Sequence, residues 1–182
     1  GTSTTIADLD IYDSEDDADI QFTASTTGDT LTVLNGQEFH IWNGDTFTAP
    51  ASTTFNGNYH NDGGVFTHNG GTITFASTSA ATIIGTATGT SALGNIVIAG
   101  PYTSSNNAST SDLTINSGAS FTAPNTLSID GSLTQNGTLT SSSSTIELTG
   151  TGETISGTLT ATNALGNIEV QGSYTASNNA ST

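Results

Sequence analysis

The sequence predicts an all-β protein, and within that class a parallel β-solenoid, from three observations. Apolar residues alternate with Thr, Ser, Asn and Asp in short segments, which is typical of half-buried strands. Gly and Asn-Gly steps separate these segments. A unit of about 72 residues occurs twice in the chain, and long internal repeats in a strand-forming chain indicate stacked structure.

The repeat is visible in two pairs of stretches. Residues 91–110 read SALGNIVIAGPYTSSNNAST, and residues 163–182 read NALGNIEVQGSYTASNNAST, 72 positions later. Residues 39–50 align with residues 113–124 at an offset of 74 positions. One-residue differences in the intervening loops account for the change of offset.

We divide the chain into three parts on this basis. Residues 1–38 form a leader that does not fit the repeat pattern, and we expect a capping region or a degenerate turn there. The first copy is residues 39–112, and the second is residues 113–182. We expect the second copy to be truncated at its C-terminal end, because the first copy continues beyond Thr110 into another strand segment.

Strand segments are expected throughout both copies. The clearest alternating segments are residues 39–41, 96–98, 113–115, 127–129, 146–148 and 168–170. No window combines a 3.6-residue apolar period with capping residues, so we expect essentially no helix.

Tandem small β-sandwich domains are the alternative architecture. The step Ile129-Asp-Gly-Ser-Leu133 resembles a hairpin turn and favours that alternative. A unit of about 72 residues is, however, small for a seven-stranded sandwich without a disulfide. A narrow solenoid turn explains why large apolar residues come in pairs and why Gly, Asn and Ser dominate elsewhere. We therefore prefer the solenoid, in the form of a right-handed β-helix.

The charge composition excludes several classes of partner. The chain has no Lys or Arg and 16 acidic residues, which gives a formal net charge of −16. A chain this acidic repels phosphate backbones, so nucleic acid is not expected as a partner. We also expect no salt bridges, so that cohesion comes from backbone hydrogen bonds and apolar stacking.

Cysteine is absent, which removes disulfides and thiolate metal sites. No apolar run approaches the roughly 20 residues of a membrane helix, so membrane insertion is not expected.

The repeat resembles those of large bacterial extracellular proteins. The resemblance lies in LTI at 113–115, LSIDGSL at 127–133, NGTL at 136–139, STIELTGTGETISG at 144–157 and LGNI at 165–168. These motifs are similar to the repeats of right-handed β-helix adhesins and surface-fibre proteins. The resemblance implies an extracellular or cell-surface location. It also implies a structural module of a fibre, stalk or surface layer, or alternatively an adhesin segment that binds glycan or another cell-surface ligand.

The leader contains the densest group of acids. Hard oxygen ligands in one short loop suit calcium, so we consider a calcium site there. The spacing does not match the helix–loop–helix pattern, because Ala18 and Ala24 stand where the turn glycine and the bidentate acid belong. A solvated acidic loop is the alternative. The residues concerned are Asp13, Glu15, Asp16, Asp17 and Asp19.

An aromatic group in the first copy is a candidate ligand-binding surface. If Phe39 and Ile41 point inward, His40 and Trp42 point outward together. An exposed indole beside an imidazole suits stacking against a sugar ring. Burial of Trp42 at a contact with another molecule is the alternative. A zinc site from the three histidines is not expected, because they lie on different strands; they are His40, His60 and His68.

Three N-glycosylation acceptor motifs occur, and the first and third are equivalent in the repeat. They begin at Asn107, Asn136 and Asn179.

Catalysis is not expected. The sequence contains no nucleophile elbow, phosphate loop or metal-hydrolase motif, and a chain without Lys and Arg lacks the basic groups that hold acidic sugars. We therefore predict a protein that is not an enzyme and needs no cofactor apart from the calcium considered above. Its expected partners are further copies of itself, joined head to tail or within a longer chain, with glycans as the alternative.

Overall fold

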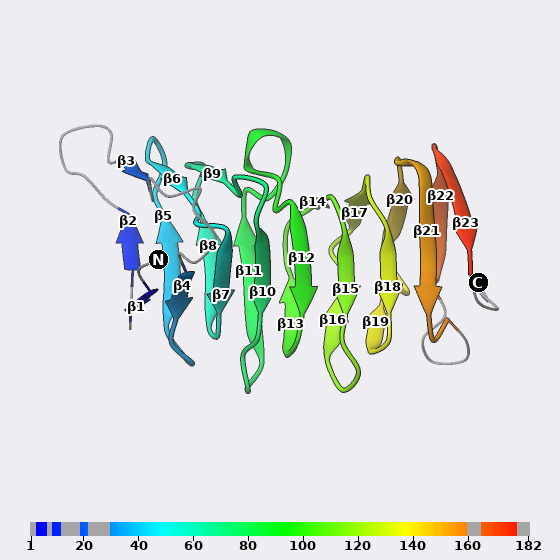
Figure 1. The fold of residues 1–182 in the computed structure, drawn as a ribbon, viewed down its shortest axis with the longest axis horizontal. Coiled ribbons are helices and arrows are strands. Elements are labelled where there is room, and N and C mark those ends of the chain that lie inside the picture. The colour runs from blue at the N-terminus through cyan, green and yellow to red at the C-terminus, as the bar shows by residue number, and fades with distance from the viewer. Residues whose placement is uncertain (1–2, 7–8, 12–18, 22–29, 160–164, 178–182) are drawn as a thin grey trace.

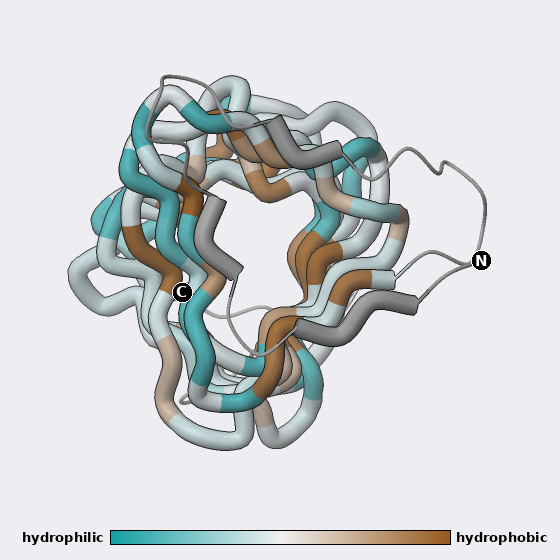
Figure 2. The backbone as a smooth tube through the Cα atoms, turned by 90° about the vertical axis from the view of Figure 1, so that its left-hand side faces the viewer, coloured by the Kyte–Doolittle hydropathy of each residue, from teal (hydrophilic) through white to brown (hydrophobic). Residues whose placement is uncertain are grey.

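The computed structural model describes residues 3–6, 9–11, 19–21, 30–159 and 165–177, with side chains from residue 30 onward. Within these residues the chain is a parallel β-solenoid. Every pair of neighbouring strands is parallel, and strands from successive turns lie side by side along one rod (Figure 1). Viewed along the rod, the backbone winds around a central core on three sides (Figure 2). The predicted solenoid is confirmed, and the alternative of tandem antiparallel sandwiches is wrong.

The first face is a nine-stranded sheet. Paired residues on its successive turns are between 17 and 27 positions apart, as in the pairs Ile96–Leu113 and Ser3–Thr30. Its strands, in spatial order, are β1 (Ser3–Ile6), β4 (Thr30–Val33), β7 (Ser52–Phe55), β10 (Thr72–Phe75), β12 (Asn95–Ile98), β15 (Leu113–Ile115), β18 (Leu133–Gln135), β21 (Thr151–Gly157) and β23 (Ser173–Ala176).

The second face is a seven-stranded sheet. Its strands are β2 (Leu9–Ile11), β5 (Glu38–Ile41), β8 (Asn58–Asn61), β11 (Ala81–Gly85), β13 (Pro101–Ser104), β16 (Ser120–Thr122) and β19 (Thr138–Thr140).

The third face consists of two shorter sheets. The first contains β3 (Asp19–Gln21), β6 (Thr46–Thr48) and β9 (Val65–Thr67), and the second contains β14 (Ala108–Thr110), β17 (Thr126–Ile129), β20 (Thr145–Leu148) and β22 (Asn167–Val170). Between β11 and β12 the chain forms a single 3-10 turn, η1 (Gly89–Ser91), which is the only helical element among the described residues. None of the described helices is long and apolar enough to cross a membrane.

The leader continues the same architecture. Strand β1 pairs with β4, β2 with β5, and β3 with β6. These leader segments therefore add to the three faces, although their sequence does not match the repeat.

The core is a column of inward side chains, as the period of two predicts. The two copies fill it differently. The first copy uses a stack of rings around Phe39, whose centroid lies 4.8 Å from that of Phe47 and 4.9 Å from that of Phe55. The second copy uses mainly Leu and Ile. Its fully buried members include Leu113, Ile115, Leu127, Ile129, Leu133, Ile146 and Leu148.

Glycine permits the close approach of successive turns at some corners. A Cβ atom on Gly57 would lie 1.8 Å from the carbonyl oxygen of Gln37 on the preceding turn, and no side chain fits in that space. The equivalent corner of the second copy also has glycine, Gly131, where a Cβ atom would lie 2.3 Å from a carboxylate oxygen of Asp112.

The sequence repeat does not return to the same face of the rod. Strand β5 of the first copy aligns with β15 of the second, yet β5 lies in the seven-stranded sheet and β15 in the nine-stranded sheet. Four steps along the seven-stranded sheet lead from β5 to β16, and β15 is the strand just before β16. One copy is therefore one strand short of four turns. Strands β12 and β22, and β13 and β23, are displaced between faces in the same way.

A tyrosine bridges turns in the first copy. The hydroxyl of Tyr102 lies 2.7 Å from the carbonyl oxygen of Phe55 and 2.9 Å from that of Gly57, and it accepts the backbone N–H of Ser77 at 3.3 Å. The phenol thus satisfies backbone groups that lie inside a corner.

The second copy repeats this bridge on another face. The hydroxyl of Tyr174 lies 2.8 Å from the carbonyl oxygen of Ile129 and 3.0 Å from that of Gly131, and it accepts the N–H of Gly150 at 3.1 Å. These partners are the repeat equivalents of those of Tyr102, so the two copies share their internal bonding as well as their backbone.

We predict that Phe39 in the ring stack can be replaced by Leu, the residue at the equivalent position of the second copy. Phe39→Ala should lower the free energy of unfolding by about 3–5 kcal/mol, because it leaves a cavity in a fully buried stack. Phe39→Leu should cost markedly less, since Leu113 occupies the equivalent position. Urea titration followed by circular dichroism measures both, and equal losses in the two variants would contradict this account of the core.

We also predict a loss of stability at alkaline pH. Burial raises the pKa of Tyr102 to about 12, although the hydrogen bond from Ser77 opposes the rise, and burial also raises the pKa of Tyr59 and of Tyr174. Because the unfolded phenols ionise near pH 10, stability should be complete below that pH and fall between about pH 10 and pH 12.

Tyrosinate absorbance and circular dichroism, followed together across this range, test the prediction. Ionisation of all four tyrosines with an ordinary midpoint near pH 10 and no loss of strand signal would contradict it. Tyr102→Phe removes one of the raised groups, so this variant should lose less of its stability over the same interval.

Candidate functional site

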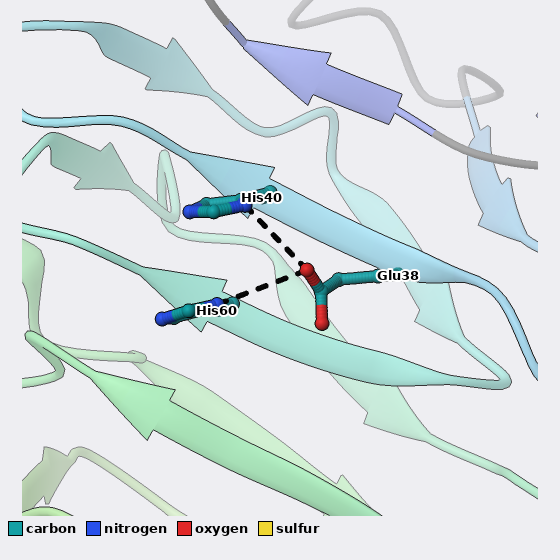
Figure 3. Close-up of side chains that lie close together, drawn as sticks. All are labelled: Glu38, His40 and His60. Atoms are coloured by element: carbon teal, nitrogen blue, oxygen red, sulfur yellow. Dashed lines mark ion pairs between the residues drawn. The ribbon is translucent and has the colours of Figure 1, made fainter.

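A cluster of polar and aromatic side chains lies on the outer face of the seven-stranded sheet. Strand β5 contributes Glu38 and His40, and strand β8 contributes His60 (Figure 3). Parallel pairing in register sets His40 directly beside His60, and the period of two places Glu38 on the same face as His40. Trp42 and Asp62 immediately follow these strands. We call these five residues the histidine cluster.

The two imidazole rings are stacked and have a carboxylate at each edge. Their centroids are 4.2 Å apart, with an angle of 13° between the planes. Glu38 Oε1 lies 3.5 Å from His40 Nδ1 and 3.7 Å from His60 Nδ1. On the opposite edge, Asp62 presents one oxygen to each ring, 3.1 Å from His40 Nε2 and 2.9 Å from His60 Nε2.

These contacts correct one expectation from the composition. We expected no salt bridge because Lys and Arg are absent, but the two histidines are within ion-pair distance of both carboxylates. When an imidazole is protonated, its charge lies against two acids of the same cluster.

Trp42 covers one side of the stack. Its ring is stacked on His40 with centroids 4.2 Å apart. His40 lies on the outer face, as the strand register predicts, yet only 9% of its side chain is exposed. Trp42 remains 41% exposed. The two residues predicted as a sugar-stacking surface are therefore adjacent, but only the indole is open to a ligand.

The second copy shows that the fold does not require the histidine cluster. The repeat equivalents of His40 and His60 are Thr114 and Thr134, which pair in register in the same manner. An ordinary threonine pair thus satisfies the backbone geometry at this position. Asn116 and Asn136 stand where Trp42 and Asp62 would be.

The remaining predicted site residues are elsewhere. His68 is apart from the other two histidines: its ring lies against Gly94, and its Nδ1 accepts the N–H of Gly70. Asn107 and Asn136 are exposed. The acidic segment considered for calcium lies outside the described residues apart from the backbone of Asp19, and Asn179 also lies outside them.

A polar groove begins at one end of the histidine cluster. It follows a corner of the rod over several turns. Its lining includes Asn61, Asp62, Thr86, Asn106, Asn107 and Asn125. Several of these amides are engaged by backbone groups: Asn61 donates to the carbonyl oxygen of Thr86, and Asn106 accepts the N–H of Gly85.

The sequence pattern alone did not identify Glu38 and Asp62 as neighbours of the histidines. A usable signal was present, since His40 and His60 are 20 residues apart, which is close to the length of one turn. Two residues that are one turn apart become neighbours when both side chains point inward or both point outward. The period of two already places Glu38 near His40 and Asp62 near His60, and only the meeting of these two pairs depends on the length of the corner.

Comparison with protein-family models, with curated proteins and with solved structures gives no match for the chain.

We predict that the histidine cluster can be removed without loss of the fold. The double variant His40→Thr/His60→Thr reproduces the threonine pair of the second copy. Cross-strand pairs are worth about 0.2–1 kcal/mol, so the free energy of unfolding should change by no more than about 1 kcal/mol. Urea titration measures the change. A variant that fails to fold would show that the cluster is a structural element.

Proposed function

We propose that this chain is a structural repeat module that lengthens a self-associating extracellular fibre, stalk or surface layer. The observation that carries the proposal is the junction between the two copies. Strands β12, β13 and β14 of the first copy pair in register with β15, β16 and β17 of the second. The pairing across the junction is the same as the pairing between turns within a copy. The unit can therefore be added to itself without a linker or a separate domain interface.

The core also crosses the junction without interruption. Ile96 and Ile98 are buried and lie in register with the buried residues Leu113 and Ile115. Because apolar burial continues from one copy to the next, each added copy stabilises its neighbour as it does in other solenoids. The resemblance to extracellular repeat proteins supports the extracellular location.

The proposal predicts that the chain associates end to end. Among the described residues, strand β23 has a single neighbour, β21, in the nine-stranded sheet, and exposed sheet edges pair with other strands unless they are blocked. Ala176 is exposed in β23, whereas its repeat equivalent Ser104 is buried at 4% exposure. Docking of a further turn should cover Ala176 in the same way.

Ala176→Lys should abolish this association, because docking would bury an inward-pointing charge. Thr175→Lys is the matched control: it adds the same charge one residue away, at a position whose equivalent, Thr103, stays exposed under the next turn. Sedimentation at physiological salt and electron microscopy should show linear particles of uniform width for the unchanged chain and for Thr175→Lys, and single rods for Ala176→Lys. Dispersed monomers of the unchanged chain, or equal behaviour of the two lysine variants, would contradict the proposal.

A glycan-binding segment is the second candidate function, and Trp42 is the observation that favours it. Trp42 is exposed and stacks on His40, and Asp62, which contacts the same His40 ring, lines the polar groove. A sugar could therefore combine ring stacking with hydrogen bonds. A glycan array with the unchanged chain and with Trp42→Asn tests this function. Specific binding that disappears in the variant supports it, and the absence of specific binding removes it.

A further inference from the structure

We propose that Glu38, His40 and His60 form a binding site for one divalent transition-metal ion of the zinc class. The ligand atoms of the three residues all lie within 4.8 Å of one another. They project from two neighbouring strands whose register is fixed by the parallel ladder (Figure 3).

The hydrogen bonds around the two rings leave acceptors facing one another. Asp62 lies against Nε2 of both rings, at 2.9 Å and 3.1 Å, and a carboxylate only accepts. A neutral ring that donates from Nε2 to Asp62 turns the lone pair of its Nδ1 toward Glu38. Both Nδ1 atoms and Glu38 Oε1 are then three acceptors facing one another, and one metal cation among them would satisfy all three.

A cation at this position must come from solution. The chain has neither Lys nor Arg, so no side chain of permanent positive charge can reach the three acceptors. Its formal net charge of −16 attracts dissolved cations to the surface.

Asp62 and Trp42 support the two histidines from behind and from the side of the ring stack. Histidines that bind metal usually donate their second ring N–H to a carboxylate, which fixes the tautomer and the direction of the ring. Asp62 is placed to do this for His40 and His60 together. Trp42 further holds His40 by stacking on its ring.

The distances suit a small ion. Bonds of about 2.1 Å in a tetrahedral arrangement separate two ligand atoms by about 3.4 Å, and Glu38 Oε1 is 3.5 Å and 3.7 Å from the two Nδ1 atoms. Because the two ring planes are nearly parallel, His60 must rotate toward His40 so that both lone pairs meet one ion. His60 and Glu38, with side chains 24% and 40% exposed, have room for this rotation.

The ligand types select the metal. Two imidazoles and one carboxylate suit Zn²⁺, Ni²⁺ or Cu²⁺, whereas Ca²⁺ and Mg²⁺ prefer a shell of oxygen atoms. Three protein ligands leave a fourth position for water or for a group of another molecule. The site is confined to the first copy, because Thr114 and Thr134 stand at the equivalent positions in the second.

Titration of the chelator-treated chain with ZnCl₂ in a calorimeter tests the proposal, with CaCl₂ as the comparison ion. We expect saturable binding of one Zn²⁺ per chain that an excess of Ca²⁺ does not displace. Co²⁺ in place of Zn²⁺ should give the strong visible absorption of a tetrahedral site with nitrogen and oxygen ligands. His60→Thr and Glu38→Gln should each abolish both signals, and Asp62→Asn should weaken Zn²⁺ binding about 10–100-fold.

His68→Ser is the matched control, because Ser141 stands at the equivalent position of the second copy. It removes a histidine of the same copy from outside the cluster and should leave both signals unchanged. Circular dichroism establishes that each variant is folded, and the threonine and asparagine variants copy residues that the second repeat already accommodates. The proposal is overturned if the unchanged chain binds no Zn²⁺, or if His60→Thr binds it as tightly as the unchanged chain does.

Discussion

The parallel ladder of backbone hydrogen bonds between successive turns is the constraint on which the rest of this structure depends. A chain with no Lys or Arg has few other means of joining distant segments. The ladder requires close, regular spacing, so glycine stands where a side chain would separate two turns, as at Gly57. It also fixes which side chains become neighbours, because a residue stacks on the residue that the register places beside it.

Within this constraint, the differences between the two copies show which residues the fold keeps and which it can replace. The core changes from rings to aliphatic side chains between Phe39 and Leu113 with the backbone preserved. The tyrosine bridges at Tyr102 and Tyr174 are kept together with all of their partners, which marks them as part of the fold. The pairing of His40 with His60 occurs once, at a position where the other copy has Thr114 and Thr134. Because Thr occupies the same positions in the second copy, the fold does not need these histidines, and they are available for binding.

Much of the fold followed from the sequence, because the solenoid depends on local patterns. The period of two correctly predicted that Phe39 and Ile41 point inward, and the repeat correctly predicted stacked parallel strands. The leader strands β1 to β4 were not predicted, since their pairing depends on neighbours supplied by the first copy. The site was predicted only in part. His40 and Trp42 were recognised. Glu38 lies on the same strand as His40 and follows from the period of two, although it was not named. His60 and Asp62 join them only through the exact length of one turn, which the corners determine and the sequence pattern does not reveal.

The displacement of each copy by one strand relative to four full turns has a consequence for longer assemblies. If further copies continue the same register, any feature that each copy carries will move to the adjacent face with every repeat. It will return to its original face after three copies. Such features would trace a spiral around the rod and give a fibre without a preferred side. A surface ligand could then be met from every direction, and lateral packing of neighbouring fibres into sheets would lack a continuous matching face.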